Sequence, residues 1–466
     1  MNQTKLLRHW AHKNGITSEA RAFLRLAIPL ATAQIAQFSV GFIDTIMMGH
    51  LNTQTLAAGG LASTTFHMLL TIISGFVMSV GVLAAEAYGA GADGAEERSR
   101  IAQMARQGLW LSLLLTLPMG LFCWLATPTL VWLQQPDIVV NLAQRYFRWI
   151  AAGIFPALGF AMLRGYLSAF SIANVITAIV VIGTVCNVSL NYVLGFGKLG
   201  FPRMELAGLG LGSSLSLWLM FGLLLVYILR HAQLSQYRFW QRWYQLDWVI
   251  LRRLLSIGLP ITVTMALEIG MFAAVGYMAG SLGTEVLAAH QIAFQTMAMI
   301  FMVPLGMAFA VTARVGLWLG KGDLIGARRA GYVAIATATV FLFFGAIALF
   351  LSRYTVIGFF IDLQDPQNEP VIVLAMNLLL VSVFAQMVDG IQRVAMSALY
   401  GLQDTRVPMI MSAVAYWGIG LTGGYALCFI AGWGAVGLWI GQYAGIAVGG
   451  IIFVWRFHRL TKRLPF

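Results

Sequence analysis

The chain has 466 residues, of which 59% are hydrophobic and only 10% are charged, and its formal net charge is +12. About a quarter of the residues in an ordinary soluble domain are charged, so this composition excludes a soluble globular fold of this length. The Lys and Arg residues are spread through many short segments instead of one compact face, which argues against nucleic acid as a partner.

Apolar runs of about 20 residues recur along the chain, and each is long enough to cross a hydrocarbon core about 30 Å thick as a helix. A transmembrane β-barrel would instead show alternating segments of about ten residues, whereas the run from Val340 to Leu351 is continuously apolar. The polar, basic segment 1–25 does not resemble a cleavable signal peptide. We therefore predict an all-α polytopic membrane protein with twelve transmembrane helices. In chain order they lie near 26–49, 57–86, 105–127, 146–164, 172–195, 206–229, 255–280, 287–313, 330–352, 371–397, 408–430 and 434–456.

The loops between these spans predict the orientation of the chain. When loops are assigned alternately to two sides, most of the 29 Lys and Arg residues fall on the side that holds both termini. By the positive-inside rule, both termini are then cytoplasmic. The predicted parts are a cytoplasmic N-terminal segment (1–25), an amino-terminal six-helix lobe (26–229), a cytoplasmic interfacial linker (230–254), a carboxyl-terminal six-helix lobe (255–456) and a cytoplasmic tail (457–466).

The two halves of the chain repeat each other. Placing Pro29 opposite Pro260 also places Leu56-Ala57-Ala58 opposite Leu287-Ala288-Ala289, and the match stays in register for about 75 positions. We call this gapless pairing of the two halves the repeat alignment. Because each copy holds an even number of spans, the copies are parallel repeats around a central cavity. Alternating access by rocking of two such lobes is typical of transporters.

Three acidic residues fall inside predicted spans: Asp44, Glu268 and Asp389. An ionisable residue at the bilayer centre costs about 2.5 to 3.5 kcal/mol, so each acid requires an explanation. One explanation is a structural hydrogen bond or ion pair, and Arg393, four positions after Asp389 on the same helix face, is a candidate partner. The other is cation coupling, because a carboxylate in a low dielectric binds a proton or Na⁺ strongly and releases it when hydrated.

The repeat favours coupling over a structural role. In the repeat alignment, Asp44 stands opposite Val275 and Glu268 stands opposite Gln37, so the acids are not duplicated with the scaffold. Asn187 and Asn191 are four positions apart and share one helix face. They are either interhelical packing contacts or donors and cation ligands beside Asp44.

Motifs of several other functions are missing from the sequence. There is no Walker A motif, no nucleophile elbow and no metal-ligand spacing among the histidines, so we predict neither an enzyme nor a cofactor. The glycine-rich run at 208–212 lacks the spacing of a dinucleotide loop, and close helix packing explains it.

Several segments together resemble the multidrug and toxic compound extrusion (MATE) family, in its NorM-type bacterial branch. The resemblance spans nearly the whole chain. It is carried by the residues at 41–49 around Asp44, 56–58, 187–192, 287–291 and 398–406. One departure is the segment 167–172, which lacks the glycine-rich turn present around Gly401.

This resemblance implies two six-helix lobes that export cationic or amphiphilic organic molecules in exchange for Na⁺ or H⁺. Asp44, Asn187 and Asn191 match the family's amino-lobe cation or proton cluster, and Glu268 and Asp389 match carboxyl-lobe acids associated with Na⁺ binding. Because both sets are present, Na⁺ is the first choice of coupling ion and H⁺ the second. The implied setting is the bacterial plasma (inner) membrane, with the lipid bilayer and small substrates as partners and the monomer as the functional unit.

The cavity lining is predicted to include Met265, Phe294 and Gln291, since methionine and aromatic side chains make soft, repackable surfaces. The main alternative function is a flippase for lipid-linked saccharides from the same wider superfamily. Its anionic cargo would favour a cationic cavity, whereas the buried charges here are mostly acidic.

Overall fold

The computed structural model describes residues 3–91, 95–132, 134–237 and 244–462, with the side chains of all of these except 3–14 and 95–97. These parts of the chain are helical, without a strand, and twelve of their helices are long and apolar enough to cross a membrane. The predicted all-α fold is confirmed. Short segments labelled η below are 3₁₀-helices (η1 and η2) or π-helices (η3 and η4).

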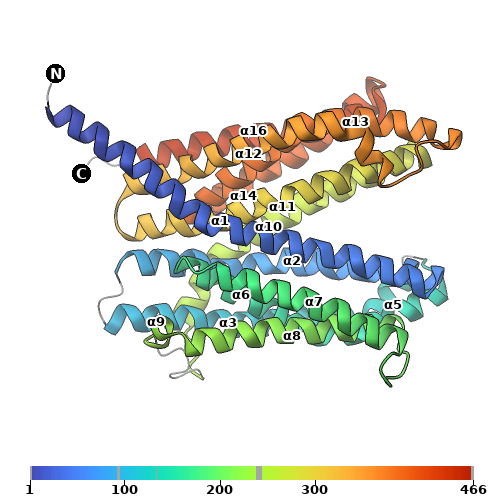
Figure 1. Ribbon diagram of the computed structural model, residues 1–466, viewed down its shortest axis with the longest axis horizontal. Helices are drawn as coiled ribbons and strands as arrows, with labels where there is room; N and C mark the ends of the chain where they lie inside the picture. The colour runs from blue at the N-terminus through green and yellow to red at the C-terminus, as the bar shows by residue number, and fades with distance from the viewer. Residues whose placement is uncertain (1–2, 92–94, 133, 238–243, 463–466) are drawn as a thin grey trace. The chain divides into compact units, whose positions relative to one another are not determined.

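The helices follow one another with short connections (Figure 1). Their bounds are α1 Gln3–Leu51, α2 Thr53–Gly89, α3 Ala95–Trp124, α4 Ala126–Trp132, α5 Asp137–Ile150, η1 Ala151–Gly153, α6 Ile154–Ala169, α7 Asn174–Phe196, α8 Leu206–Arg230, α9 Ala232–Ser235, α10 Trp248–Ser281, α11 Thr284–Gly320, α12 Leu324–Gly358, η2 Pro366–Asn368, α13 Glu369–Gly401, α14 Arg406–Ser412, η3 Ala413–Leu421, α15 Thr422–Tyr425, η4 Ala426–Ile430 and α16 Gly434–Lys462.

The chain forms two compact units that do not coincide with its two sequence halves. The first unit comprises 1–31 and 263–466, and the second comprises 32–262. The chain therefore passes from one unit to the other inside α1 and again inside α10, at positions that the repeat alignment places opposite each other. We call these two helices the crossing helices. The predicted division of the chain into two six-helix lobes at the linker 230–254 follows the sequence repeats, and it stays a prediction.

The first part of each crossing helix packs closely against a glycine of its own unit. A Cβ on Gly306 of α11 would lie 2.4 Å from the Ala31 backbone of α1, and a Cβ on Gly75 of α2 would lie 2.7 Å from the Thr262 backbone of α10. The repeat alignment places Gly75 opposite Gly306 and Ala31 opposite Thr262. The repeat thus extends to individual packing contacts.

The repeat also holds in the helix ends and turns. Both ends of α2 correspond to the ends of α11 in the repeat alignment. The segment 167–172, which lacks the glycine-rich turn, nevertheless folds as its counterpart does: Ser171 and Gln403 have φ of 62° and 61°. The Ile172 N–H donates to the Leu167 carbonyl at 3.1 Å, and the Asp404 N–H donates to the Leu399 carbonyl at 3.0 Å. The missing glycine therefore does not change the turn.

Within the second unit, α2 packs on α3 and α6, and α8 packs on α5, α6 and α7. Figure 1 shows these long helices running beside one another. Within the first unit, α13 packs on α11, α12 and α16. In this unit Met271, Tyr416 and Trp439 belong to one buried apolar cluster, so Met271 is a core residue.

α1 is helical from Gln3 to Leu51 and so includes most of the predicted N-terminal segment 1–25, whose cytoplasmic location stays a prediction. The Arg314 guanidinium on α11 donates to both carboxylate oxygens of Glu19 on α1, at 2.8 and 2.6 Å, and Trp318 donates to Glu19 at 3.1 Å. The Glu19 side chain is only 3% exposed. This contact ties the first part of α1 to the first unit.

Removing the cation of this pair is expected to destabilise the fold. Arg314→Gln leaves the Glu19 carboxylate buried without its counter-charge, which costs about 3 to 5 kcal/mol. Thermal unfolding of the detergent-purified protein measures the loss. The control is Glu205→Gln, which breaks a 3.4 Å pair with Arg203 that is largely exposed and contributes less than about 1 kcal/mol. Equal unfolding midpoints for the two variants would contradict the expectation.

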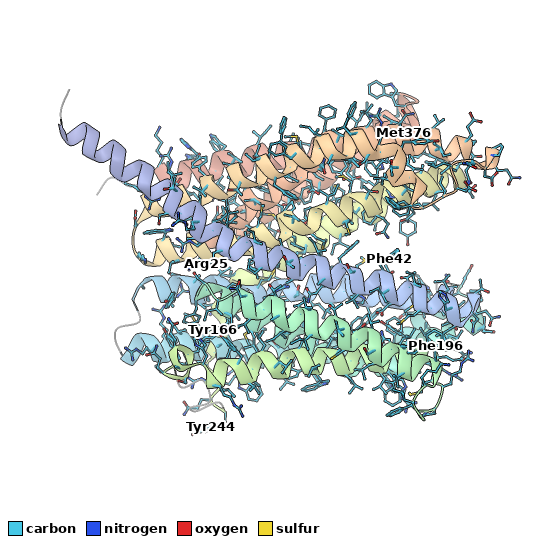
Figure 2. The ribbon with its side chains drawn as sticks, in the orientation of Figure 1. Arg25, Phe42, Tyr166, Phe196, Tyr244 and Met376 are labelled. Atoms are coloured by element: carbon cyan, nitrogen blue, oxygen red, sulfur yellow. The ribbon has the colours of Figure 1, made fainter. Side chains whose placement is uncertain are left out.

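The predicted interfacial linker 230–254 contains an aromatic and basic segment from Tyr237 to Tyr244, and residues 238–243 of it lie outside the described part of the chain. Tyr237 is described and packs against Phe170, with ring centroids 5.2 Å apart. Phe170 also contacts Tyr166, which is labelled in Figure 2. The start of the linker is therefore anchored on the end of α6.

Candidate functional site: two buried polar clusters

The second unit contains a polar cluster built from three helices, which we call the amino cluster: Asp44, Asn187, Asn191, Ser213 and Ser216. The Asn191 side chain on α7 donates to the Asp44 carboxylate on α1 at 2.8 Å and to the side-chain Oδ1 of Asn187 at 3.2 Å. Asn187 in turn donates to the hydroxyls of Ser213 and Ser216 on α8, both at 3.1 Å. The structure thus brings together the three residues predicted for this unit.

Asp44 is the only ionisable member of the amino cluster. Its side chain faces the protein, whereas Phe42, two positions earlier on α1 and labelled in Figure 2, is largely exposed. Asp44 is 7% exposed and Asn191 is fully buried. Among the described residues, the Asn191 Oδ1 atom has no hydrogen-bond partner. A carboxylate and an unpaired amide oxygen are ligands that suit a hard monovalent cation, and the carboxylate also accepts a proton.

The position of Asn191 depends on Gly212 of α8. A Cβ at Gly212 would lie 2.2 Å from Asn191 Oδ1, so only glycine lets the amide occupy this place. Gly212→Ala is expected to displace Asn191 from Asp44, at a cost of about 1 to 3 kcal/mol for overpacking, and to lower transport. The measurement is gradient-driven efflux together with the thermal unfolding midpoint.

The matched control is Gly222→Ala on the same helix, where a Cβ would meet nothing within 4 Å. That substitution is expected to leave efflux unchanged and to stabilise α8 by up to about 1 kcal/mol. If both variants transport equally well, the Asn191 position does not matter for function.

The first unit contains a second cluster, which we call the carboxyl cluster: Glu268, Asp389, Gln392, Arg393 and Tyr416. The Arg393 guanidinium on α13 donates from Nη2 to both carboxylate oxygens of Glu268 on α10. The guanidinium carbon also lies 5.3 Å from the Phe301 ring centroid, within cation–π range. The candidate partner of Arg393 from sequence was Asp389, so that pairing is corrected to Glu268.

Asp389 is 6% exposed and lies near enough to Glu268 and Arg393 to interact with both electrostatically. Within the described residues, it makes neither a hydrogen bond nor an ion pair within 4 Å. A buried carboxylate with so few partners is costly to keep charged unless a cation joins it. Asp389 is thus the less compensated of the two acids in this unit.

A π-helical segment supports the carboxyl cluster. η3 is π-helical over Ala413–Leu421, and π-helical turns often mark functional sites. Tyr416 accepts a hydrogen bond from the Gln392 side chain, and Trp417 donates to the carbonyl of Leu267 at 3.0 Å. Leu267 directly precedes Glu268, so η3 fixes the backbone that carries this acid.

The residues predicted to line the cavity have different surroundings. Met265 is buried, Gln291 is exposed, and Phe294 stacks on His290 with ring centroids 6.0 Å apart. His290 is buried and accepts a hydrogen bond from Trp439 at 3.0 Å. The role of these residues as a lining stays a prediction.

No group of three or more His, Cys, Asp or Glu side chains that could hold a metal ion occurs in the described residues.

Sequence reasoning did not find Ser213, Ser216, Gln392 or Tyr416. Ser213 and Ser216 lie just after the glycine-rich run at 208–212, for which close helix packing was the explanation. Tyr416 is far from Glu268 and Asp389 in the chain, and nothing in its local sequence marks it as polar.

Comparison with known proteins shows relatives along nearly the whole chain. A family model named MatE matches the chain twice, over 29–193 and 260–426, and the two matches begin at positions that the repeat alignment places opposite each other. A probable multidrug resistance protein NorM of Synechococcus sp. is 48% identical over 97% of this chain and 96% of its own length. A protein of the same name from Synechocystis sp. is 43% identical over 96% of both chains.

Solved structures agree on the fold. A MATE protein crystallised in complex with MaL6 superposes with a TM-score of 0.86 and covers 95% of this chain and 96% of its own. Its sequence identity is 20%, so this similarity concerns the arrangement of helices alone.

Proposed function

This chain belongs to the MatE family of multidrug efflux transporters, and from that premise we propose that it exports cationic or amphiphilic organic molecules in exchange for Na⁺. It is a multi-pass membrane protein that transports small organic substrates, and the transporter family to which it belongs is not a family of enzymes. The identity of the ion and the charge of the substrate are the proposed parts.

One observation supports the proposal above the others: each compact unit holds a buried acid cluster that the other unit does not duplicate. Asp44 lies with Asn187 and Asn191 in one unit, and Glu268 and Asp389 lie in the other. Structural ion pairs would tend to be repeated with the scaffold, as the packing glycines are. Acids at unmatched places instead suit ion coupling, because each binds a cation strongly where water is scarce.

Na⁺ is the first choice of ion and H⁺ the second. In the proposed scheme, Na⁺ binds in the carboxyl cluster that contains Glu268 and Asp389, and the amino cluster takes up a second cation or a proton. Oxygen atoms of carboxylates and amides are the ligands that hard cations prefer. Asp44 offers such oxygens together with Asn187 and Asn191.

The mechanism that follows is competition. A cation that binds at the acids neutralises the negative charge that holds a cationic substrate, and it thereby favours release and closure. The membrane potential assists, because inward movement of one charge through 100 mV is worth about 2.3 kcal/mol. A ligand shifts a two-state equilibrium only by its differential affinity for the two states, and the acids supply that difference.

We further propose that the protein acts as a monomer in the bacterial inner membrane with both termini in the cytoplasm. The distribution of Lys and Arg among the loops supports this orientation.

The test is efflux of a fluorescent cationic dye from proteoliposomes of the purified chain, with Na⁺ and pH gradients imposed separately. Efflux that requires an inward Na⁺ gradient is the expected result. Efflux driven by the pH gradient alone would replace Na⁺ with H⁺. Absence of efflux under both gradients, from folded protein, would contradict antiport and favour lipid flipping instead.

A further inference from the structure

Two acids share one arginine in the carboxyl cluster. Arg393 contacts both oxygens of Glu268, while Asp389, one helical turn before Arg393, has no hydrogen bond among the described residues. Side chains four positions apart on a helix lie within reach of each other, so Asp389 is a second position for the same guanidinium. Arg393 thus has two carboxylates within reach and donates to one of them, Glu268.

The charges of the cluster leave a single negative charge. Glu268 and Arg393 neutralise each other, and Tyr416 and Gln392 are neutral, so Asp389 alone lacks a counter-charge. One monovalent cation completes the balance. Two cations would leave the buried cluster positively charged, which is unfavourable in a low dielectric.

The equivalent place in the other unit supports a special role for this arginine. There, Arg164 on α6 donates to the side-chain oxygens of Gln34 and Gln37 on α1, at 2.6 and 3.3 Å. Gln37 stands opposite Glu268 in the repeat alignment. Both units therefore place an arginine of the equivalent helix against the first helix of the repeat. Among the described contacts, Arg393 donates to an acid and Arg164 donates to two glutamine side chains.

Among the described residues, the Arg393 side chain is hydrogen-bonded through one terminal nitrogen of its guanidinium and not through Nε. Its Nη2 atom makes the contact to Glu268, whereas its Nε atom has no hydrogen-bond partner in the described part of the chain. Rotation of the guanidinium toward Asp389 breaks no Nε hydrogen bond. The Phe301 ring offers a neutral surface on which the guanidinium rests.

We propose that Arg393 is a built-in counter-ion that neutralises Glu268, so that the carboxyl cluster binds one monovalent coupling cation at Asp389. This inference rests on the proposed function and assigns different tasks to its two acids: Glu268 holds the arginine, and Asp389 holds the ion. Without Glu268, Arg393 turns to Asp389 and takes the place of the cation. When Glu268 and Arg393 are both replaced by neutral residues, Asp389 is again available to bind the cation.

The test is suppression of one substitution by another. Glu268→Gln should lower gradient-driven dye efflux by about 50-fold, the factor that corresponds to one charge moving through 100 mV. Glu268→Gln combined with Arg393→Gln should restore efflux to within severalfold of the unmodified chain. The same comparison can be made by ²²Na⁺ binding to purified protein that carries Asp44→Asn, which removes the acid of the amino cluster. In that background, Glu268→Gln should lower Na⁺ binding, and adding Arg393→Gln should restore it.

Matched controls separate this effect from a general change of charge. Glu285→Gln alters an exposed acid of the same unit and should leave efflux unchanged. Glu268→Gln with Arg406→Gln removes an exposed arginine instead of Arg393 and should not restore efflux. If the Gln pair fails to fold, Glu268→Met with Arg393→Met removes the same charges, since apolar replacement of a buried pair is often tolerated.

An active unmodified chain with an inactive, folded double variant would overturn the inference, because Glu268 would then be a required ligand of the ion. Undiminished efflux by Glu268→Gln alone would overturn it as well. An unmodified chain without gradient-driven efflux would overturn the proposed function and this inference with it. The two failures are therefore distinguished by the unmodified protein.

Discussion

Asp44→Asn is expected to abolish ion-driven export while the protein stays folded. Asp44 is the single ionisable group of the amino cluster, and its neighbours Asn187, Asn191, Ser213 and Ser216 carry no charge that could replace it. Asparagine has nearly the same shape, so packing is retained. Loss of one coupled charge removes about 2.3 kcal/mol of driving free energy per 100 mV, which corresponds to a factor of about 50 in the substrate ratio that transport can maintain.

The measurement is initial efflux rate as a function of the imposed gradient, with dye binding and thermal unfolding measured on the same preparation. Asp137→Asn, an exposed acid at the start of α5 in the same unit, is the control and should behave as the unmodified chain. If Asp44→Asn keeps a gradient-dependent rate, Asp44 has no part in coupling. If the variant unfolds, the role of Asp44 is structural.

Asp389→Asn is expected to be equally inactive and at least as stable as the unmodified chain. In the described residues the Asp389 carboxylate makes no hydrogen bond or close ion pair that the substitution would break. Removing a buried charge that lacks a close partner relieves a desolvation cost. With Glu268 and Arg393 still paired, the cluster has no net charge left to attract a cation.

Thermal unfolding and ²²Na⁺ binding in detergent test the two halves of this expectation. The free energy of unfolding should stay within about 1 kcal/mol of the unmodified protein or rise, while Na⁺ binding at the carboxyl cluster disappears. A large fall in stability would mean that Asp389 stabilises the fold through its charge. Normal Na⁺ binding would place the ion elsewhere.

Part of the amino cluster could be predicted from the sequence, because the spacing of its two asparagines is local. Asn187 and Asn191 share a helix face by spacing alone, and the resemblance to a known family placed Asp44 beside them. Ser213 and Ser216 were not predicted, because serine in a glycine-rich span is an ordinary packing residue. Their contact with Asn187 depends on how α7 and α8 pack.

The carboxyl cluster was less accessible from sequence. The spacing of Asp389 and Arg393 indicates that they can meet, but Glu268, on a different helix, competes for the same arginine and holds it in the structure. Which carboxylate binds the guanidinium depends on where α10 and α13 place the two acids, and only tertiary structure reveals this. The π-helical turns of η3 have no distinctive sequence pattern, so the placement of Tyr416 and Trp417 was not predicted either.

The ends of the spans were predicted less well than their number. Hydropathy located the apolar part of the first span, but α1 extends through the polar residues before it. The extension is stabilised by the Glu19–Arg314 contact, which joins positions far apart in the sequence. Periodicity and composition contain no information about such a contact.

The crossing helices bear on how a chain of this kind could have arisen. Since α1 and α10 each contribute to both compact units, a polypeptide as long as one repeat would lack part of the unit that it builds. Two such copies would complete each other by exchanging the beginning of the first helix, which is a domain-swapped dimer with a twofold axis. Fusion of the two genes would preserve that exchange and free each copy to change separately, so that one carries Gln37 where the other carries Glu268.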